Sequence, residues 1–205
     1  MTPDGLLGIF RENVVYLRGT PKSIGGNAND YLKITRDPGK IGEFNVSGVS
    51  HAVPVMKVEA AEKGEEGAFL SWICDYEAND IRYQTLTGDR LFCFTATMNG
   101  CTFGIGSATS SGTLIVSHAN KKAGNDDIIA QSREQARLTK LQIEHGKLFQ
   151  PTDYEFGPNR KVSMTLFGIF IGGTWEFYYQ QYLVNFCTYT LKTFQKVNQT
   201  RLTSL

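Results

Sequence analysis

The sequence predicts a β-rich α+β fold that forms one domain over residues 1–205. Short runs of aromatic and β-branched residues recur between turn signals from residue 51 onward, which is typical of strands. One stretch, residues 126–146, has the apolar periodicity of a long helix. The length suits a single domain, and an apolar content of 41% is enough for a hydrophobic core.

The first part of the chain, residues 1–50, is predicted to be rich in loops. Residues 6–17 are apolar and fit a short helix or a strand equally well. Residues 18–48 are rich in Gly, Asn, Pro and Asp, which predicts mostly loop. Strands are then expected over residues 51–120, at 53–58, 69–76, 81–86, 91–97, 102–106 and 113–118. Pro54 favours an edge position for the first of them, because proline cannot donate a ladder hydrogen bond.

The second half is predicted to hold the helix and the last strands. Asn125, Asp126 and Asp127 are typical N-caps for the helix of residues 126–146, and Gly146 suits its end. Residues 150–160 are interpreted as a loop. Over residues 161–195 a hairpin of 161–171 and 174–183 is expected to turn at Gly172-Gly173, followed by a last strand at 184–194.

Composition excludes several classes of function. The net charge of +1 gives no excess that would favour nucleic acid or an anionic membrane. The longest uncharged apolar run, Ser163 to Trp175, is too short to span a bilayer, and no secretory signal is evident at the start. Four cysteines and three histidines form no spaced metal-ligand set, so no metal site is expected. Without a membrane-spanning run we expect a soluble protein, and we also expect a monomer.

The hairpin of residues 101–107 and 112–118 predicts a reactive pair. With the turn centred on Thr109-Ser110, opposed residues have numbers that sum to 219, so Cys101 is expected opposite His118. Phe103, Ile105, Leu114 and Val116 then share their face, as a core face requires. Opposed Cβ atoms lie about 4.5–5.5 Å apart. A thiol and an imidazole at that spacing can form a thiolate–imidazolium pair, the activated nucleophile of an acyl-transfer enzyme.

Asn99 and Gly100 are predicted to shape the substrate side of this site. Asn-Gly is a turn signal. A glycine just before the nucleophile allows a sharp turn and leaves room for a substrate amide. The N–H of Cys101 would then serve as one donor of an oxyanion hole.

The segment Met98-Asn99-Gly100-Cys101, followed by a glycine-containing strand and His118, resembles the catalytic region of the cysteine–histidine glutamine deamidase toxins. This family includes the cytotoxic necrotizing factor catalytic domain and the Burkholderia lethal factor, whose motif reads Leu-Ser-Gly-Cys. Only Gly-Cys is kept literally here. In the lethal factor and in chemotaxis glutamine deamidases a threonine precedes the cysteine by six positions, as Thr95 does here. The resemblance covers about residues 95–118. The length of the chain is also most similar to that of the lethal factor.

The resemblance implies an antiparallel β-sandwich-like core flanked by helices, and a protein-glutamine deamidase of the bacterial toxin type. Cys101 would be the nucleophile, His118 the base, and Thr95 a third residue that orients His118. The substrate would be a host protein, with a translation initiation helicase or a Rho-type GTPase as family candidates. Such a virulence factor is made in the bacterial cytoplasm and reaches the host cytosol, here without a cleaved signal peptide.

Other functions stay open at the level of sequence. An amine in place of water at the thioester step would give a transglutaminase. A chemoreceptor-type deamidase shares the cysteine and histidine but is shorter. A non-enzymatic β-sandwich that binds a partner or a glycan predicts a buried, inert Cys101, and a cysteine peptidase needs a third polar group on the histidine. Trp72, Cys74 and Tyr76 are interpreted as core, and Cys93 and Cys187 as inert members of apolar strands.

Overall fold

A computed structural model of the chain describes residues 1–17, 31–77, 80–120, 134–135, 137, 147–154 and 162–197. Over these residues the protein is strand-rich, as the sequence predicts. The strands form three sheets, with strand orders β1-β5-β2-β6, β12-β10-β11-β8 and β4-β3-β15-β14-β13-β9-β7. The first and third are mixed, and the second is antiparallel throughout.

The ambiguous stretch near the N-terminus forms a helix and then a strand. α1 (Pro3–Glu12) begins at Thr2, whose hydroxyl accepts a hydrogen bond from the Gly5 N–H at 3.1 Å. Pro3 suits the first turn, where its missing N–H costs nothing. Asn13 adopts an extended conformation and ends the helix, and β1 (Val14–Leu17) follows.

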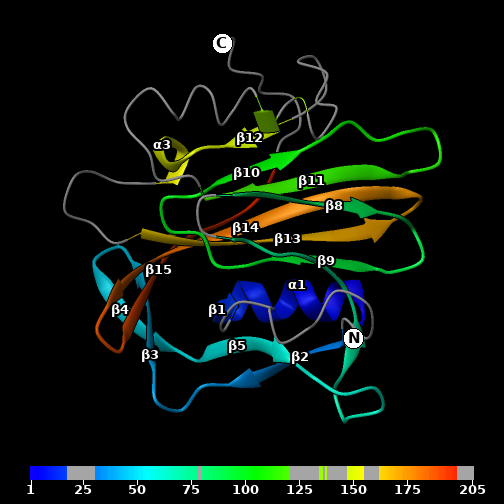
Figure 1. Ribbon diagram of the computed structural model, residues 1–205. Helices are drawn as coiled ribbons and strands as arrows, with labels where there is room; N and C mark the ends of the chain where they lie inside the picture. Colours follow the sequence, from blue (N-terminus) through cyan, green and yellow to red (C-terminus); the bar gives the residue numbers. More distant parts are fainter. Residues whose placement is uncertain are drawn as a thin grey trace.

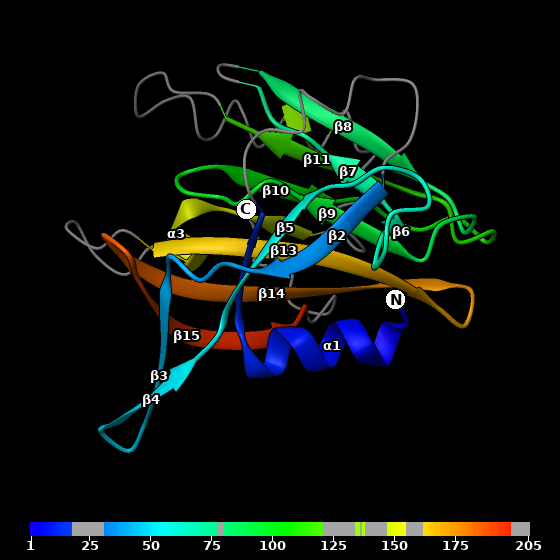
Figure 2. The ribbon, with the colours of Figure 1, turned by 90° about the horizontal axis from the view of Figure 1, so that it is seen from below.

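Residues 31–48, the described part of the loop predicted over 18–48, do not form a loop, and the strands there continue to residue 53. These strands are β2 (Tyr31–Arg36), β3 (Ile41–Val46) and β4 (Val49–Val53), and β5 (Val55–Ala60) follows. Their alternation is weak because β3 and β4 are largely exposed on both faces. The β3–β4 hairpin extends away from the rest of the molecule (Figures 1 and 2). Pairing of β3 with β15 decides its conformation, which local composition does not encode.

Pro54 marks a change of sheet. It lies between β4, at the edge of the seven-stranded sheet, and β5, which is flanked by β1 and β2. The strand predicted at 53–58 therefore begins after the proline, and it is an interior strand rather than an edge strand. Similarly, the strand predicted at 69–76 divides into β6 (Phe69–Leu70) and β7 (Trp72–Cys74), which belong to different sheets.

The centre of the molecule is the C-terminal hairpin. β13 (Val162–Ile171) pairs over its whole length with residues 174–183 of β14 (Thr174–Asn185), and the hairpin turns at Gly172-Gly173, which confirms that prediction. Both glycines have positive φ, +59° and +84°, a conformation that side chains disfavour. β15 (Thr188–Lys196) begins four residues later than predicted, so Cys187 lies exposed in a turn and not in an apolar strand.

The remaining strands carry most residues of the predicted site. β9 (Phe92–Thr95) pairs with β13, while β8 (Ile81–Leu86), β10 (Thr102–Ile105), β11 (Leu114–Ala119) and β12 (Lys147–Phe149) form the antiparallel sheet. A short helix, α3 (Pro151–Tyr154), lies where a loop was predicted. Most of the helix predicted at 126–146 lies outside the described residues; the described Glu134, Gln135 and Arg137 are helical.

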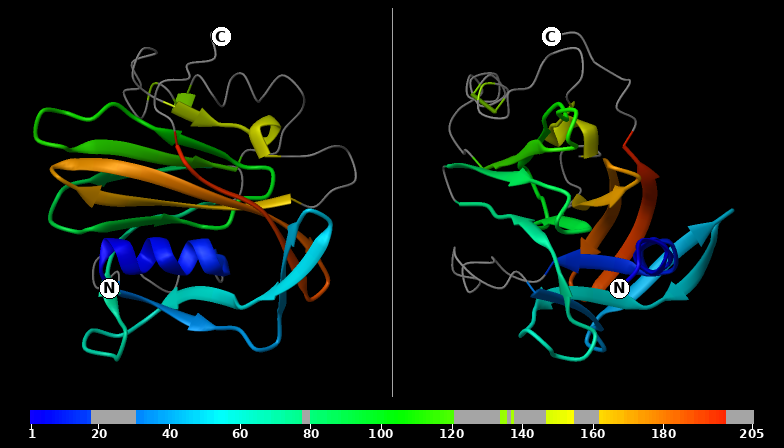
Figure 3. Two further views of the ribbon diagram at one scale, coloured as in Figure 1. Left: turned by 180° about the vertical axis from the view of Figure 1, so that it is seen from behind. Right: turned by 90° about the vertical axis from the view of Figure 1, so that its right-hand side faces the viewer.

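The sheets are arranged in layers (Figures 1 and 3), and the two larger of three apolar clusters join them; the third cluster holds Val14, Val55, Tyr182, Tyr189 and Leu191. One cluster joins the antiparallel sheet to one face of the seven-stranded sheet; its members include Phe103, Ile105, Val116, Met164 and Phe177. The other joins α1 and the β1-β5-β2-β6 sheet to the opposite face, through Phe10, Val58 and Phe167 among others. No helix of the described part of the chain is long and apolar enough to cross a membrane.

Candidate active site

The β10–β11 register differs from the predicted one by two residues. Opposed numbers sum to 221, so His118 lies opposite Phe103 and Val116 lies opposite Ile105. The prediction that Cys101 stands directly opposite His118 is therefore wrong. Cys101 lies just before β10, one diagonal step from His118, and diagonal neighbours in a regular ladder are about 7–8 Å apart. The register differs from the predicted one because the turn between β10 and β11 centres one position later than Thr109-Ser110.

A shift of two residues keeps every side chain on its predicted face, because side chains alternate with period two. Cys101 and Phe103 belong to the cluster between the two sheets. His118 faces the same layer, with its ring centroid 6.4 Å from that of Phe103 in an edge-on arrangement. His118 is fully buried, and Cys101 is 6% exposed. The structure thus places the two side chains on one side of the sheet.

Thr95 contacts His118 directly. The last residue of β9, it lies in the seven-stranded sheet, and its hydroxyl oxygen is 2.7 Å from Nδ1 of His118. The same hydroxyl donates to the Cys74 carbonyl oxygen at 3.1 Å. A hydroxyl has one proton, so with that proton on the carbonyl it accepts from Nδ1–H. This arrangement fixes the proton of the neutral imidazole on Nδ1 and leaves the lone pair on Nε2.

Nε2 of His118 is buried and has no hydrogen-bond partner among the described residues. The predicted contact between this nitrogen and the sulfur of Cys101 is therefore not formed. Burial lowers the pKa of His118 from 6.5 to about 3, because desolvation disfavours the charged ring. The imidazole is neutral at pH 7, which contradicts a resting thiolate–imidazolium pair. The site instead holds a neutral imidazole with its proton on Nδ1, so Nε2 is able to accept a proton or a hydrogen bond.

The segment between β9 and β10 crosses from one sheet to the other. Met98 pairs with Met164 through two backbone hydrogen bonds of 2.8 and 2.9 Å, which fixes the segment against β13. Asn99 and Gly100 then form an exposed turn, and Gly100 has a φ of +87°, the conformation for which glycine was expected there. The chain enters β10 directly after Cys101, so the cysteine lies between this turn and the strand.

Three residues that sequence reasoning did not assign to the site contact it. The buried hydroxyl of Tyr154, in α3, donates to the carbonyl oxygen of Cys101 at 2.7 Å. The Gln135 carboxamide donates to the Thr102 carbonyl at 3.0 Å. The ring of Tyr76 lies with its centroid 5.5 Å from that of His118. All three are distant from the hairpin in sequence, and the chain itself gives no local signal for them.

The other cysteines and histidines of the chain are not assigned to the site. Cys74 and Cys93 are buried, and burial raises the pKa of both thiols. His51 is exposed in β4. Lys121, Lys122, the Asn125–Asp127 cap and His145 lie outside the described residues. Within the described part of the chain, no group of three or more His, Cys, Asp or Glu side chains is arranged to hold a metal ion.

Chemically, the arrangement offers a thiol, a neutral base with its free nitrogen in the same layer, and a hydroxyl that fixes the base. These are the elements of nucleophilic acyl transfer. A scan of protein-family models finds no match to this chain, and a search of the curated proteins finds no match either.

Proposed function

We propose that the protein is a protein-glutamine deamidase, with Cys101 as nucleophile, His118 as base and Thr95 as the residue that positions His118. The observation that carries this proposal is the buried Nε2 of His118, which has no partner among the described residues while Nδ1 is held by Thr95. A buried nitrogen without a hydrogen bond costs free energy. A catalytic role, in which a reacting group is the partner, is one explanation for such a nitrogen.

In the proposed reaction the Cys101 thiol passes its proton to Nε2 as the sulfur attacks the carboxamide carbon of a substrate glutamine. His118 then gives that proton to the nitrogen as the carbon–nitrogen bond breaks and ammonia leaves. Water attacks the resulting thioester, again passing a proton to Nε2, and the carbon–sulfur bond breaks to give glutamate and the thiol. The proton moves within the reaction, which agrees with a neutral imidazole at rest.

The turn at Asn99-Gly100 supports the assignment of these two residues to substrate binding. Both are exposed and directly precede Cys101, so a substrate segment can approach the sulfur over them. We further propose that the two sheets around the shared apolar cluster correspond to the β-sandwich of the toxin deamidases. The substrate is then a host protein, reached after delivery from the bacterial cytoplasm, and a transglutaminase side activity would follow if an amine replaces water.

The experiment is a comparison of host-cell lysates treated with wild type, Cys101→Ser and His118→Ala. Mass spectrometry should find glutamines that gain about one mass unit with wild type alone, the change from carboxamide to acid. Cys187→Ser is the matched control, because it makes the same substitution at an exposed cysteine in a turn. Conversion that survives Cys101→Ser, or none with wild type, would refute the proposal.

One observation favours a second candidate, a non-enzymatic binding module. Cys101 is only 6% exposed and belongs to the apolar core. In that case Cys101→Ala would lower stability by about 1–2 kcal/mol through lost packing and leave any partner binding intact. Denaturation and pull-down of the same variant distinguish the two candidates.

A further inference from the structure

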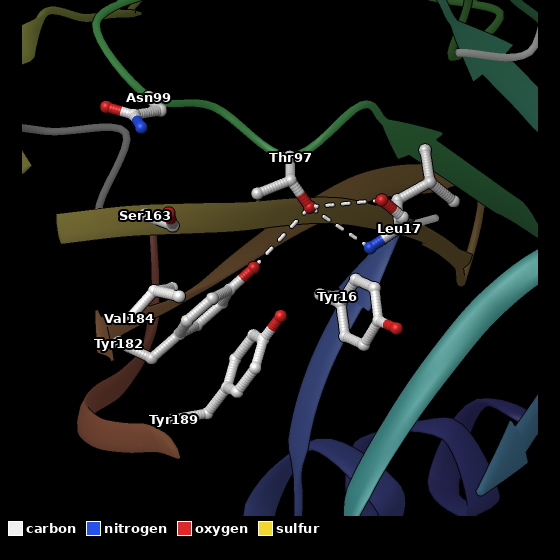
Figure 4. Close-up of a pocket in the computed structure, with 8 residues that line it drawn as sticks. All are labelled: Tyr16, Leu17, Thr97, Asn99, Ser163, Tyr182, Val184 and Tyr189. Carbon is white, nitrogen blue, oxygen red and sulfur yellow. Dashed lines mark hydrogen bonds between the residues drawn. The ribbon is translucent and has the colours of Figure 1, made fainter. Parts of the chain in front are cut away.

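A pocket of about 260 Å³ lies beside the segment that carries Cys101, on the side of the seven-stranded sheet facing β1 (Figure 4). Its walls come from five parts of the chain that are distant in sequence. The residues that line it are Tyr16, Leu17, Thr97, Asn99, Ser163, Tyr182, Val184 and Tyr189. None of these side chains carries a charge at neutral pH. The pocket is thus an uncharged site, and three of its eight lining residues are tyrosine.

Three tyrosine rings give the pocket its shape. The centroid of the Tyr189 ring lies 5.5 Å from that of Tyr16, in a stacked arrangement, and 5.7 Å from that of Tyr182. The hydroxyl of Tyr182 is held at 3.1 Å from the Thr165 hydroxyl. The hydroxyl of Tyr16 donates to Asp37. Because hydrogen bonds fix two of the three rings, the aromatic wall is preformed, which lowers the entropic cost of binding.

The pocket also presents polar groups that nothing in the described structure engages. The Tyr189 hydroxyl, the Asn99 carboxamide and the Ser163 hydroxyl have no hydrogen bond to any described residue. Figure 4 shows none between them and the other residues that line the pocket. The Lys40 ammonium already lies 5.8 Å from the centroid of the Tyr189 ring, which disfavours a cationic ligand. The chemistry fits an uncharged ring that can also accept or donate a hydrogen bond.

The size of the pocket limits the ligand. Sites for drug-sized molecules and cofactors usually measure about 300–1,000 Å³, so this one is suited to a single side chain. Aromatic rings favour partners with centroids about 4.5–7 Å apart, the spacing that the tyrosine wall already shows. A phenol or phenyl group satisfies both the volume and the lining.

The pocket and Cys101 lie on opposite faces of the seven-stranded sheet, and the exposed turn at Asn99-Gly100 lies between them. A substrate that reaches both must lie across this turn. Asn99 lines the pocket and lies two residues before Cys101. Two trans peptide units span at most about 7.6 Å between Cα atoms. An extended substrate advances about 3.3 Å per residue, so a side chain two or three residues from the bound glutamine falls within that reach.

We propose that this pocket is a subsite for an aromatic side chain, tyrosine or phenylalanine, located within three residues of the glutamine in the substrate protein. The inference rests on the proposed deamidase function. It assigns to Tyr16, Tyr182 and Tyr189 the recognition of sequence around the target glutamine, and to Asn99 and Ser163 the polar contacts of the bound ring.

The test uses blocked peptides with one glutamine, in which tyrosine occupies in turn each position up to three residues on either side, and alanine occupies the others. Released ammonia gives kcat/KM. At one or two positions tyrosine should raise kcat/KM about tenfold over the all-alanine peptide, equivalent to about 1.4 kcal/mol. Ser163→Leu, which fills the pocket from β13, should reduce that preference to about one. Ser50→Leu makes the same change on exposed β4 and should retain it.

A binding measurement separates failure of the subsite from failure of the deamidase. N-acetyl-tyrosinamide is titrated into the Cys101→Ser protein, and NMR shifts are followed. Saturable binding that Ser163→Leu abolishes supports the pocket even if no peptide is deamidated, in which case only the proposed function falls. Equal turnover of all peptides, or no saturable binding, overturns the subsite. If Ser163→Leu does not fold, Tyr189→Phe replaces it and should lower the preference for tyrosine but not for phenylalanine.

Discussion

Replacement of Thr95 by valine nearly preserves the shape of the side chain and removes its hydroxyl. Thr95 is fully buried, and the lost hydroxyl makes two hydrogen bonds, at 2.7 Å to Nδ1 of His118 and at 3.1 Å to the Cys74 carbonyl. Each buried hydrogen bond contributes about 0.5–1.5 kcal/mol net, and a buried group left without a partner costs about 1–3 kcal/mol. We expect Thr95→Val to lower the free energy of unfolding by about 2–4 kcal/mol.

The effect on catalysis has a separate cause. Without an acceptor at Nδ1, the proton of the imidazole is no longer fixed there, and the tautomer with the proton on Nε2 competes. That tautomer cannot accept the thiol proton, and general-base catalysis contributes about 10²–10⁴-fold to rate. Deamidation should therefore fall by about 10²-fold under conditions in which the variant is fully folded.

Thr95→Ser is the matched control, because it keeps the hydroxyl and removes one buried methyl group. Its expected cost is about 1 kcal/mol of stability, with activity close to wild type. Urea denaturation gives the stabilities, and ammonia release at a temperature well below both midpoints gives the rates. Equal activity of Thr95→Val and wild type would refute the role of the hydroxyl, as would equal losses in the valine and serine variants.

Three further predictions follow from the buried site. Because burial lowers the pKa of His118 from 6.5 to about 3, the unfolded state binds a proton that the folded state does not, and stability should fall by about 2–3 kcal/mol between pH 6.5 and 4.5. His118→Gln should remove this pH-dependent loss of stability, whereas the control His51→Gln, on the exposed β4, should retain it. Urea denaturation at several pH values measures both. Tyr154→Phe removes the hydroxyl that donates to the Cys101 carbonyl, so we expect it to lower Tm and to reduce activity about tenfold. Wild-type activity of this variant would contradict a positioning role for Tyr154. In a Cys187→Ser background, mass-resolved thiol labelling should modify Cys101 before the two other buried cysteines, and the reverse order would contradict an accessible nucleophile.

The sequence by itself determined the strand-rich character of the chain and most strands after residue 68. The hairpin at Gly172-Gly173 was predictable because two adjacent glycines between aromatic and β-branched runs admit few other conformations. The face shared by Cys101, Phe103 and His118 was also predictable. Side-chain alternation depends only on the parity of the register, and a shift of two residues does not change parity.

Only the tertiary structure decided the register itself and the surroundings of His118. The turn after β10 holds several residues that can form its centre, so its position depends on pairing with β8 and β12 on either side. Burial lowers the pKa of His118, and burial follows from the packing of two sheets, which spacing along one hairpin does not reveal. β3 and β4 formed where composition indicated loop, since pairing with β15 supplied the hydrogen bonds that local preference did not.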